Sequence, residues 1–196
     1  MIGIIVPAHN EEDFLDDCIK SLVASAHHAD LHGEAVEILI VLDDCSDGSL
    51  QIAREHSVNV HVCAHRNVGM TRAAGAQWML DRGARWLAFT DADTVVPYAW
   101  LAEQVAVEAD AVCGIVQVDD WSEHAPQVRE RYDALYRPVD DHRHIHGANL
   151  GVSSEAYLRA GGFKALAAHE DVHLVADLER IGARIVWTAR NSVTTS

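Results

Sequence analysis

Basic residues are scarce in this sequence of 196 residues, with 15 lysines and arginines against 30 aspartates and glutamates, a formal net charge of −15. So acidic a chain repels phosphate backbones and anionic lipid headgroups at long range. The charge balance therefore argues against nucleic acid and against a membrane surface as partners. A phosphate compound can still bind locally, where a metal ion or a helix N-terminus compensates its charge.

Cysteines and long apolar runs are also few. Cys18, Cys45, Cys63 and Cys113 form no C-x-x-C pair, so neither a zinc knuckle nor a disulfide framework is expected. The N-terminus has no basic segment before its short apolar run, so we expect no signal peptide. No stretch approaches about 18 uninterrupted apolar residues, so we expect no transmembrane segment. These absences predict a cytoplasmic protein, either free or peripheral at the inner membrane face.

Two nucleotide-binding motifs are missing as well. No G-x-G-x-x-G follows an expected strand, and no G-K-[ST] phosphate loop is present. Both motifs place backbone N–H groups against phosphates. A dinucleotide-binding domain or a P-loop enzyme therefore fits this chain poorly.

The remaining composition is that of an ordinary globular protein, 49% hydrophobic and 23% charged. Its length predicts a single domain over 1–196. Apolar runs rich in β-branched residues alternate with segments of helical periodicity, which predicts an α/β fold with a mostly parallel, Rossmann-like sheet flanked by helices. Strands are expected over 2–7, 37–42, 58–64, 86–90, 111–118, 148–152 and 184–188. Helices are expected over 11–25, 49–56, 69–82, 97–108, 125–136, 154–160 and 169–181.

Polar clusters follow three of these strands, at 8–12, 43–48 and 91–93. Ligands of parallel sheets bind beyond the carboxyl ends of the strands, so we expect these clusters along one edge. Some of their acids are alternatively helix N-caps, an interpretation that suits Asp47. Asp91 and Asp93 are separated by one small residue and offer the oxygen ligands that Mg²⁺ and Mn²⁺ prefer.

Seven short motifs occur along the chain in a fixed order. They are P-x-x-N-E at 7–11, D-D-x-S-D-G-[ST] at 43–49, N-x-G-x-x-R-x-x-G at 67–75, D-x-D at 91–93, G-x-N at 147–149, G-G-F at 161–163 and E-D at 170–171. Each is weak alone, but their shared order makes chance unlikely. Together they resemble the family 2 glycosyltransferases, which have the GT-A fold, over nearly the whole chain.

The resemblance implies a metal-dependent, inverting transferase that moves a sugar from a nucleotide-sugar donor, a UDP-sugar by family weighting, to an acceptor hydroxyl. It implies that 1–118 is the nucleotide-binding part and 119–196 the acceptor and catalytic part. The implied nucleotide-sugar contacts are Pro7, Asn10, Glu11, Asp44, Arg72 and Asp91.

The same resemblance implies the reacting groups. Asp93, with Asp91, would hold the divalent cation, Mn²⁺ or Mg²⁺, on the diphosphate, and His173 is a further metal-ligand candidate. Asp171 would be the general base, with Glu170 beside it. Gly147 and Asn149 would line the acceptor or donor-sugar wall. A carboxylate that takes the proton of an acceptor hydroxyl accelerates such a step by about 10²–10⁴.

Three features depart from the family pattern. Cys45 stands where Gly is common in the second motif. The Q-x-x-R-W motif of processive polysaccharide synthases is absent, which argues against a polymerase. The chain ends soon after the last expected strand, where many members carry more residues, and an acceptor site without such elements would be incomplete.

Two other functions compete with this prediction. His169-Glu170-x-x-His173 fits the zinc-hydrolase pattern H-E-x-x-H, but no histidine follows it to supply a third ligand. A non-catalytic nucleotide-sugar-binding protein is the second alternative, and the presence of both Asp93 and Asp171 argues against it.

Other aromatic and imidazole side chains have two interpretations each. His142, His144 and His146 alternate before Gly147. They are either transition-metal ligands or, the interpretation we favour, part of a polar wall of the site or of a solvated loop. Trp121 could stack on a sugar ring or fill a gap in the surface.

Overall fold

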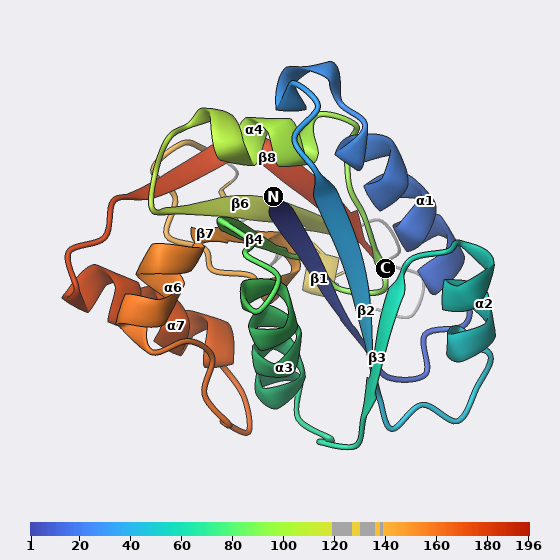
Figure 1. The fold of residues 1–196 in the computed structure, drawn as a ribbon. Coiled ribbons are helices and arrows are strands. Elements are labelled where there is room, and N and C mark those ends of the chain that lie inside the picture. The colour runs from blue at the N-terminus through green and yellow to red at the C-terminus, as the bar shows by residue number, and fades with distance from the viewer. Residues whose placement is uncertain (119–126, 130–135, 138) are drawn as a thin grey trace.

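The fold is built on one curved, mixed β-sheet with helices on both faces (Figure 1). This computed structural model describes residues 1–118, 127–129, 136–137 and 139–196. The strands are β1 (Ile2–Ala8), β2 (Val36–Asp43), β3 (Asn59–Cys63), β4 (Trp86–Phe89), β5 (Thr94–Val95), β6 (Ala111–Val118), β7 (Leu150–Ser153) and β8 (Ile185–Thr195). Within the described residues their order across the sheet is β3-β2-β1-β4-β7-β6-β8-β5.

The helices lie in two groups on opposite faces (Figure 1). They are α1 (Leu15–Ala26), α2 (Ser49–Glu55), α3 (Val68–Leu80), α4 (Trp100–Ala106), α6 (Ser154–Ala160) and α7 (Glu170–Arg180), with 3-10 turns η1 (Ala29–Leu31) and η2 (Gly147–Asn149). Strand β1 shows why both faces are covered. Ile2, Ile4 and Val6 pack with α1 and α4, whereas Ile5 packs with α3, because alternate residues of a strand point to opposite faces.

The parallel half of the sheet sets up the site. Strand β1 pairs in parallel with β2 and β4, and β2 pairs in parallel with β3. The carboxyl ends of β1, β2 and β4 therefore meet at one edge, as the polar clusters led us to expect. The predicted α/β fold with a helix-flanked sheet is confirmed. The sheet is mixed rather than mostly parallel, because β7 runs antiparallel to both β4 and β6, and β5 runs antiparallel to β8.

The last strand is longer than the sequence predicted. We expected it to end at residue 188, with a polar tail after it, but β8 continues to Thr195 and pairs with β6 and β5. Its polar end alternates as a strand does, with Asn191 and Val193 buried. The extended strand brings Ser196 beside a predicted metal ligand: the hydroxyl of Ser196 donates to Oδ2 of Asp93 at 3.1 Å.

Smaller differences concern element ends. The first helix begins at Leu15, so Glu11 and Glu12 stay in the preceding loop and turn. The short strand β5 was not predicted. The expected helix over 125–136 falls mostly outside the described residues, and Trp121 falls outside them entirely. In the ranges that the structure describes, no helix is both long and apolar enough to cross a membrane.

Helix α3 approaches the sheet closely at Gly75. A Cβ atom there would lie 2.4 Å from Cγ2 of Ile5 and 2.9 Å from Cγ2 of Val41. We expect Gly75→Ala to lower the free energy of unfolding by about 1–3 kcal/mol, because overpacking outweighs the better helix propensity of alanine. Urea denaturation of Gly75→Ala beside Gln77→Ala, an exposed position of the same helix, measures this. An unchanged or raised urea midpoint for Gly75→Ala would show that Ile5 and Val41 accommodate the added methyl group without a loss of stability.

Candidate functional site

A pocket of about 1250 Å³ opens where β1, β2 and β4 end. Most of the residues predicted for the site line it, although they come from segments spread over the whole chain. They are Pro7, Asn10, Glu11, Asp44, Arg72, Asp91, Asp93, Gly147, Glu170 and Asp171. The fold thus brings the nucleotide-side motifs and the E-D motif to a single cavity.

Asn149 and His173 are not among the residues that line this pocket. The Asn149 side chain is fully buried: its Nδ2 donates to the carbonyls of Ile115 and Asn191, each at 2.9 Å, and its Oδ1 accepts from the indole of Trp100 at 2.9 Å. Asn149 therefore ties β6, β8 and α4 together behind the site. His173 is exposed on α7.

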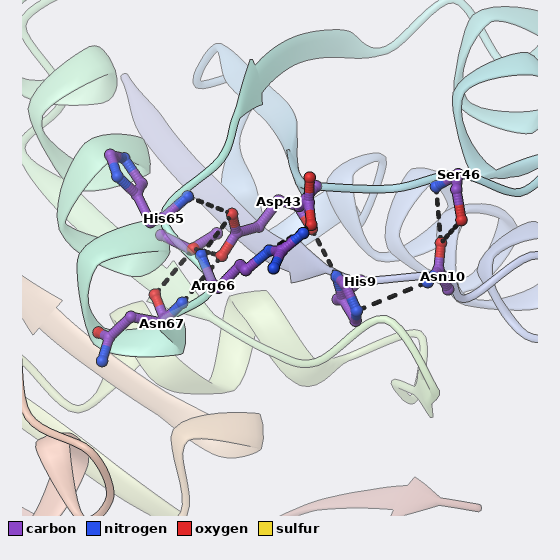
Figure 2. A network of polar contacts seen from close by, with 9 residues as sticks. His9, Asn10, Asp43, Ser46, His65, Arg66 and Asn67 are labelled. Atoms are coloured by element: carbon purple, nitrogen blue, oxygen red, sulfur yellow. Dashed lines mark hydrogen bonds and ion pairs between the residues drawn. The ribbon is translucent and has the colours of Figure 1, made fainter.

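The buried carboxylate of Asp43, the last residue of β2, organises the pocket beyond the ends of β1 and β2 (Figure 2). Oδ1 accepts the backbone N–H groups of His65 and Arg66 at 2.5 and 2.9 Å, and Oδ2 accepts that of Asn67 at 3.1 Å and the hydroxyl of Thr71 at 2.8 Å. Burial alone would raise the pKa of Asp43, but these donors outweigh it and lower the pKa. Of this pair of aspartates, the sequence analysis named only Asp44 as a site residue, because the motif does not show which of the two side chains points inward.

Several pocket residues other than glycine adopt left-handed backbone angles. The φ angles are 59° at Asn10, 53° at Asp44, 50° at Arg66 and 62° at His169, and all four residues line the pocket. Asn, Asp and His tolerate this region better than Arg. Such strain persists only where surrounding contacts enforce it, and it is typical of ligand sites. One such contact is the backbone N–H of Ser46, which donates to Oδ1 of Asn10 at 2.8 Å.

A buried arginine joins the two halves of the pocket. The Arg72 guanidinium, 4% exposed, donates to Oδ1 of Asp91 and to Oε1 of Glu170. A Cβ atom on Gly147 would lie 2.4 Å from Cζ of Arg72, so only glycine allows the chain to cross the guanidinium there. The predicted residues Arg72, Asp91, Gly147 and Glu170 are thus in one packed cluster.

Asp171 follows this cluster at the start of α7. Its Oδ2 accepts the backbone N–H of Gly147 at 2.8 Å, and its Oδ1 accepts that of Val172 at 2.8 Å. These two bonds orient a half-buried carboxylate at the pocket wall. His146 lines the same region, and its Nε2 lies 3.1 Å from the hydroxyl of Tyr136. Burial, followed by the charge of His144, lowers the pKa of His146.

The carboxylates of Asp91 and Asp93 suit a divalent cation. Burial raises the pKa of Glu11, and the nearby charges of Asp93 and Asp91 raise it further, so a cation would relieve a local excess of negative charge. Within the described ranges, no group of three or more His, Cys, Asp or Glu side chains has an arrangement that could hold a metal ion. Phosphate oxygens of a ligand and water would therefore have to complete the coordination, as Mg²⁺ sites commonly require.

The histidines do not form a zinc centre in the described part of the chain. His169 is the N-cap of α7 with a left-handed backbone, so it does not share a helix face with His173 in the manner H-E-x-x-H requires. The rings of His142 and His144 stack at 5.5 Å, and those of His144 and His146 at 6.3 Å. Stacked rings do not converge on one ion. Of the three, His146 lines the pocket, whereas His142 is buried and His144 does not line it, so the polar-wall interpretation fits His146 but not the other two.

Residues 3–164 match the sequence profile of one known family, described as Glycosyl transferase family 2. The chain belongs to this family. It is 27% identical over 158 residues to the uncharacterized glycosyltransferase EpsJ of Bacillus subtilis (strain 168), an alignment that covers 74% of this chain and 44% of EpsJ.

Solved structures with a similar fold are glycosyltransferases too. S. aureus TarS in complex with UDP-GlcNAc has a TM-score of 0.73 at 15% identity, covering 100% of this chain and 58% of TarS. The mannosyltransferase PcManGT from Pyrobaculum calidifontis, in complex with GDP-Man and Mn²⁺, has a TM-score of 0.71 at 18% identity. The match covers 98% of this chain and 56% of PcManGT. The fold is the GT-A fold, as predicted. The chain spans roughly half the length of these relatives.

Removing the buried guanidinium should cost much of the stability of the domain. We expect Arg72→Ala to lower the free energy of unfolding by about 3–5 kcal/mol, because Glu170 and Asp91 lose their shared partner inside the protein. Arg54→Ala removes an exposed arginine of α2 and should change stability by less than about 0.5 kcal/mol. Equal urea midpoints for the two variants would contradict a structural role for Arg72.

Proposed function

We propose that this chain is a metal-dependent, inverting glycosyltransferase domain that moves a sugar from a nucleotide-sugar donor to an acceptor hydroxyl. One observation carries the proposal: a single pocket of a family 2 chain gathers the carboxylates of Asp44, Asp91, Asp93 and Asp171. The non-catalytic alternative does not account for an Asp171 carboxylate held at the pocket wall by two backbone N–H groups.

The two proposed parts of the site, nucleotide-binding and acceptor-binding, follow one another along the chain. In this proposal 1–118 binds the nucleotide, with Pro7, Asn10, Glu11 and Asp44 around the base and ribose, and 119–196 supplies the acceptor side. Both parts line the pocket, which supports the division. Because its guanidinium is 4% exposed and already paired, Arg72 would position Asp91 and Glu170 rather than contact the nucleotide directly.

Asp91 and Asp93 would hold the divalent cation against the donor diphosphate. When bound, a cation of this kind offsets the negative charge that develops on the leaving diphosphate. The hydroxyls of Thr94 and Ser196 lie 3.2 and 3.1 Å from the two carboxylate oxygens of Asp93 and keep that side chain oriented. Mn²⁺ accompanies GDP-Man in PcManGT, which supports the choice of Mn²⁺ or Mg²⁺.

Asp171 would take the proton from the acceptor hydroxyl as that oxygen attacks the anomeric carbon. Its backbone donors, Gly147 and Val172, hold the carboxylate in place, and no titratable side chain among the described residues forms a hydrogen bond or ion pair with it. Glu170 is occupied by Arg72, so it would support the site rather than act as a second base. A single displacement with one base gives inversion.

The identity of the donor base remains a prediction. We favour UDP, because TarS has been solved in complex with UDP-GlcNAc. GDP is the alternative, because PcManGT has been solved with GDP-Man. The expected cytoplasmic location also stays a prediction.

Replacing Asp93 tests the cation site. We expect Asp93→Asn to abolish the gain in UDP or GDP affinity that Mn²⁺ confers, because a neutral amide is a poorer ligand for a hard cation. Calorimetric titration of UDP and of GDP, first in the presence of Mn²⁺ and then in the presence of EDTA, measures that gain. Asp17→Asn removes an exposed charge of α1 and should preserve it. Full metal dependence in Asp93→Asn would show that other groups hold the cation.

Replacing Asp171 tests the base. We expect Asp171→Asn to bind nucleotide as the unaltered protein does but to release nucleoside diphosphate from nucleotide sugars about 10²–10⁴-fold more slowly. Release rates with a panel of UDP- and GDP-sugars and hydroxyl acceptors measure this. A near-normal rate in Asp171→Asn would make the assignment of the base wrong.

A further inference from the structure

Arg66 is a pocket residue that the proposed function does not use. Its exposed guanidinium is paired with Asp44 at the nucleotide end. We propose that Arg66 and Asp44 together read the keto edge of the nucleobase, an N–H beside a C=O, so that Arg66 determines specificity for the base. This inference rests on the proposed function, since it concerns the same nucleotide.

The backbone of Arg66 is held from beneath. Asp43 accepts its N–H at 2.9 Å, along with those of His65 and Asn67 on either side. These bonds enforce the left-handed angle of 50° at Arg66, which an arginine rarely adopts unaided. Figure 2 shows the Arg66 side chain extending from this anchored loop toward the side where His9 lies. The buried carboxylate of Asp43 therefore fixes the backbone position from which the Arg66 side chain extends.

The two side chains leave complementary groups free. Nε of Arg66 donates to Oδ2 of Asp44 at 2.5 Å. In the part of the chain that the structure describes, neither the Nη atoms of Arg66 nor Oδ1 of Asp44 has a hydrogen-bond partner. The side chains are 77% and 34% exposed, and both residues line the pocket. A ligand there meets a pure acceptor and a pure donor as neighbours.

This pairing distinguishes two kinds of base. Uracil and guanine present a ring N–H beside a carbonyl, whereas cytosine and adenine present a bare ring nitrogen beside an amino group. A carboxylate only accepts and a guanidinium only donates. With Asp44 at the ring nitrogen and Arg66 at the exocyclic group, as we propose, the keto edge satisfies both side chains, whereas an amino edge in the same position satisfies neither. Unlike an asparagine, neither group can reverse its role. Matched pairs of this kind give discrimination of about tenfold or more.

Calorimetry with matched nucleotides tests the inference in the presence of Mn²⁺. The unaltered protein should bind UDP about tenfold or more tightly than CDP, or GDP than ADP. Arg66→Ala should weaken the keto nucleotide by about three- to tenfold and change the amino nucleotide by less than about twofold, so the ratio shrinks. Arg54→Ala, an exposed arginine of α2 outside the pocket, should leave the ratio unchanged.

Arg66→Lys separates base recognition from simple charge. If Arg66 only attracted the diphosphate, Arg66→Ala would weaken UDP and CDP equally and Arg66→Lys would restore both, which would overturn the inference. If Arg66 reads the base, lysine should not recover the ratio, because an ammonium lacks the planar fork. Failure of every nucleoside diphosphate to bind would overturn the proposed function, whereas binding with an unaltered ratio in Arg66→Ala would overturn only this inference.

Discussion

The site depends on one buried positive charge. Arg72 lies on the inner face of α3 and pairs at once with Asp91, beyond the end of β4, and with Glu170, at the start of α7. Two carboxylates this close repel each other unless a cation stands between them. The guanidinium, with donors on two sides, suits this task better than a lysine ammonium would. Without it, the sheet edge and α7 would lose their main polar connection.

Close packing around that charge explains residues that carry no chemistry themselves. Gly147 must lack a side chain, because its backbone crosses the guanidinium of Arg72. The same backbone then offers its N–H to Asp171. The orientation of the proposed base is therefore a consequence of how tightly the chain wraps around Arg72, and the G-x-N and E-D motifs are parts of one arrangement.

A second buried charge has the corresponding role beyond the end of β2, where we propose that the nucleotide binds. Asp43 collects three successive N–H groups of the β3–α3 loop and the hydroxyl of Thr71. Bonds to a charged acceptor are stronger than neutral ones, so they can hold Arg66 in a strained backbone conformation. Both ends of the pocket thus use a buried charge to shape exposed groups, which leaves those exposed groups available to a ligand.

The sequence alone determined the parts that local pattern encodes. Continuous apolar runs identified β1, β2 and β4, because strands buried on both faces need apolar residues at every position. The strand order of an α/β fold then placed Asp44, Asp91 and Asp93 at one edge, and the family motifs pointed to Glu170 and Asp171. The full length of β8 was beyond such reasoning, because its polar residues become a strand only by pairing with β6 and β5.

Only the tertiary structure decided which polar side chains face the pocket. Asn149 and Asp43 are buried and Asp44 is not, yet all three stand in motifs of similar polarity. Arg72 became a partner of carboxylates from residues 91 and 170, and Arg66 a partner of Asp44. Periodicity and motif spacing describe neighbours along the chain, whereas these contacts join segments 19 to 98 residues apart. Their geometry depends on how helices and loops pack on the sheet.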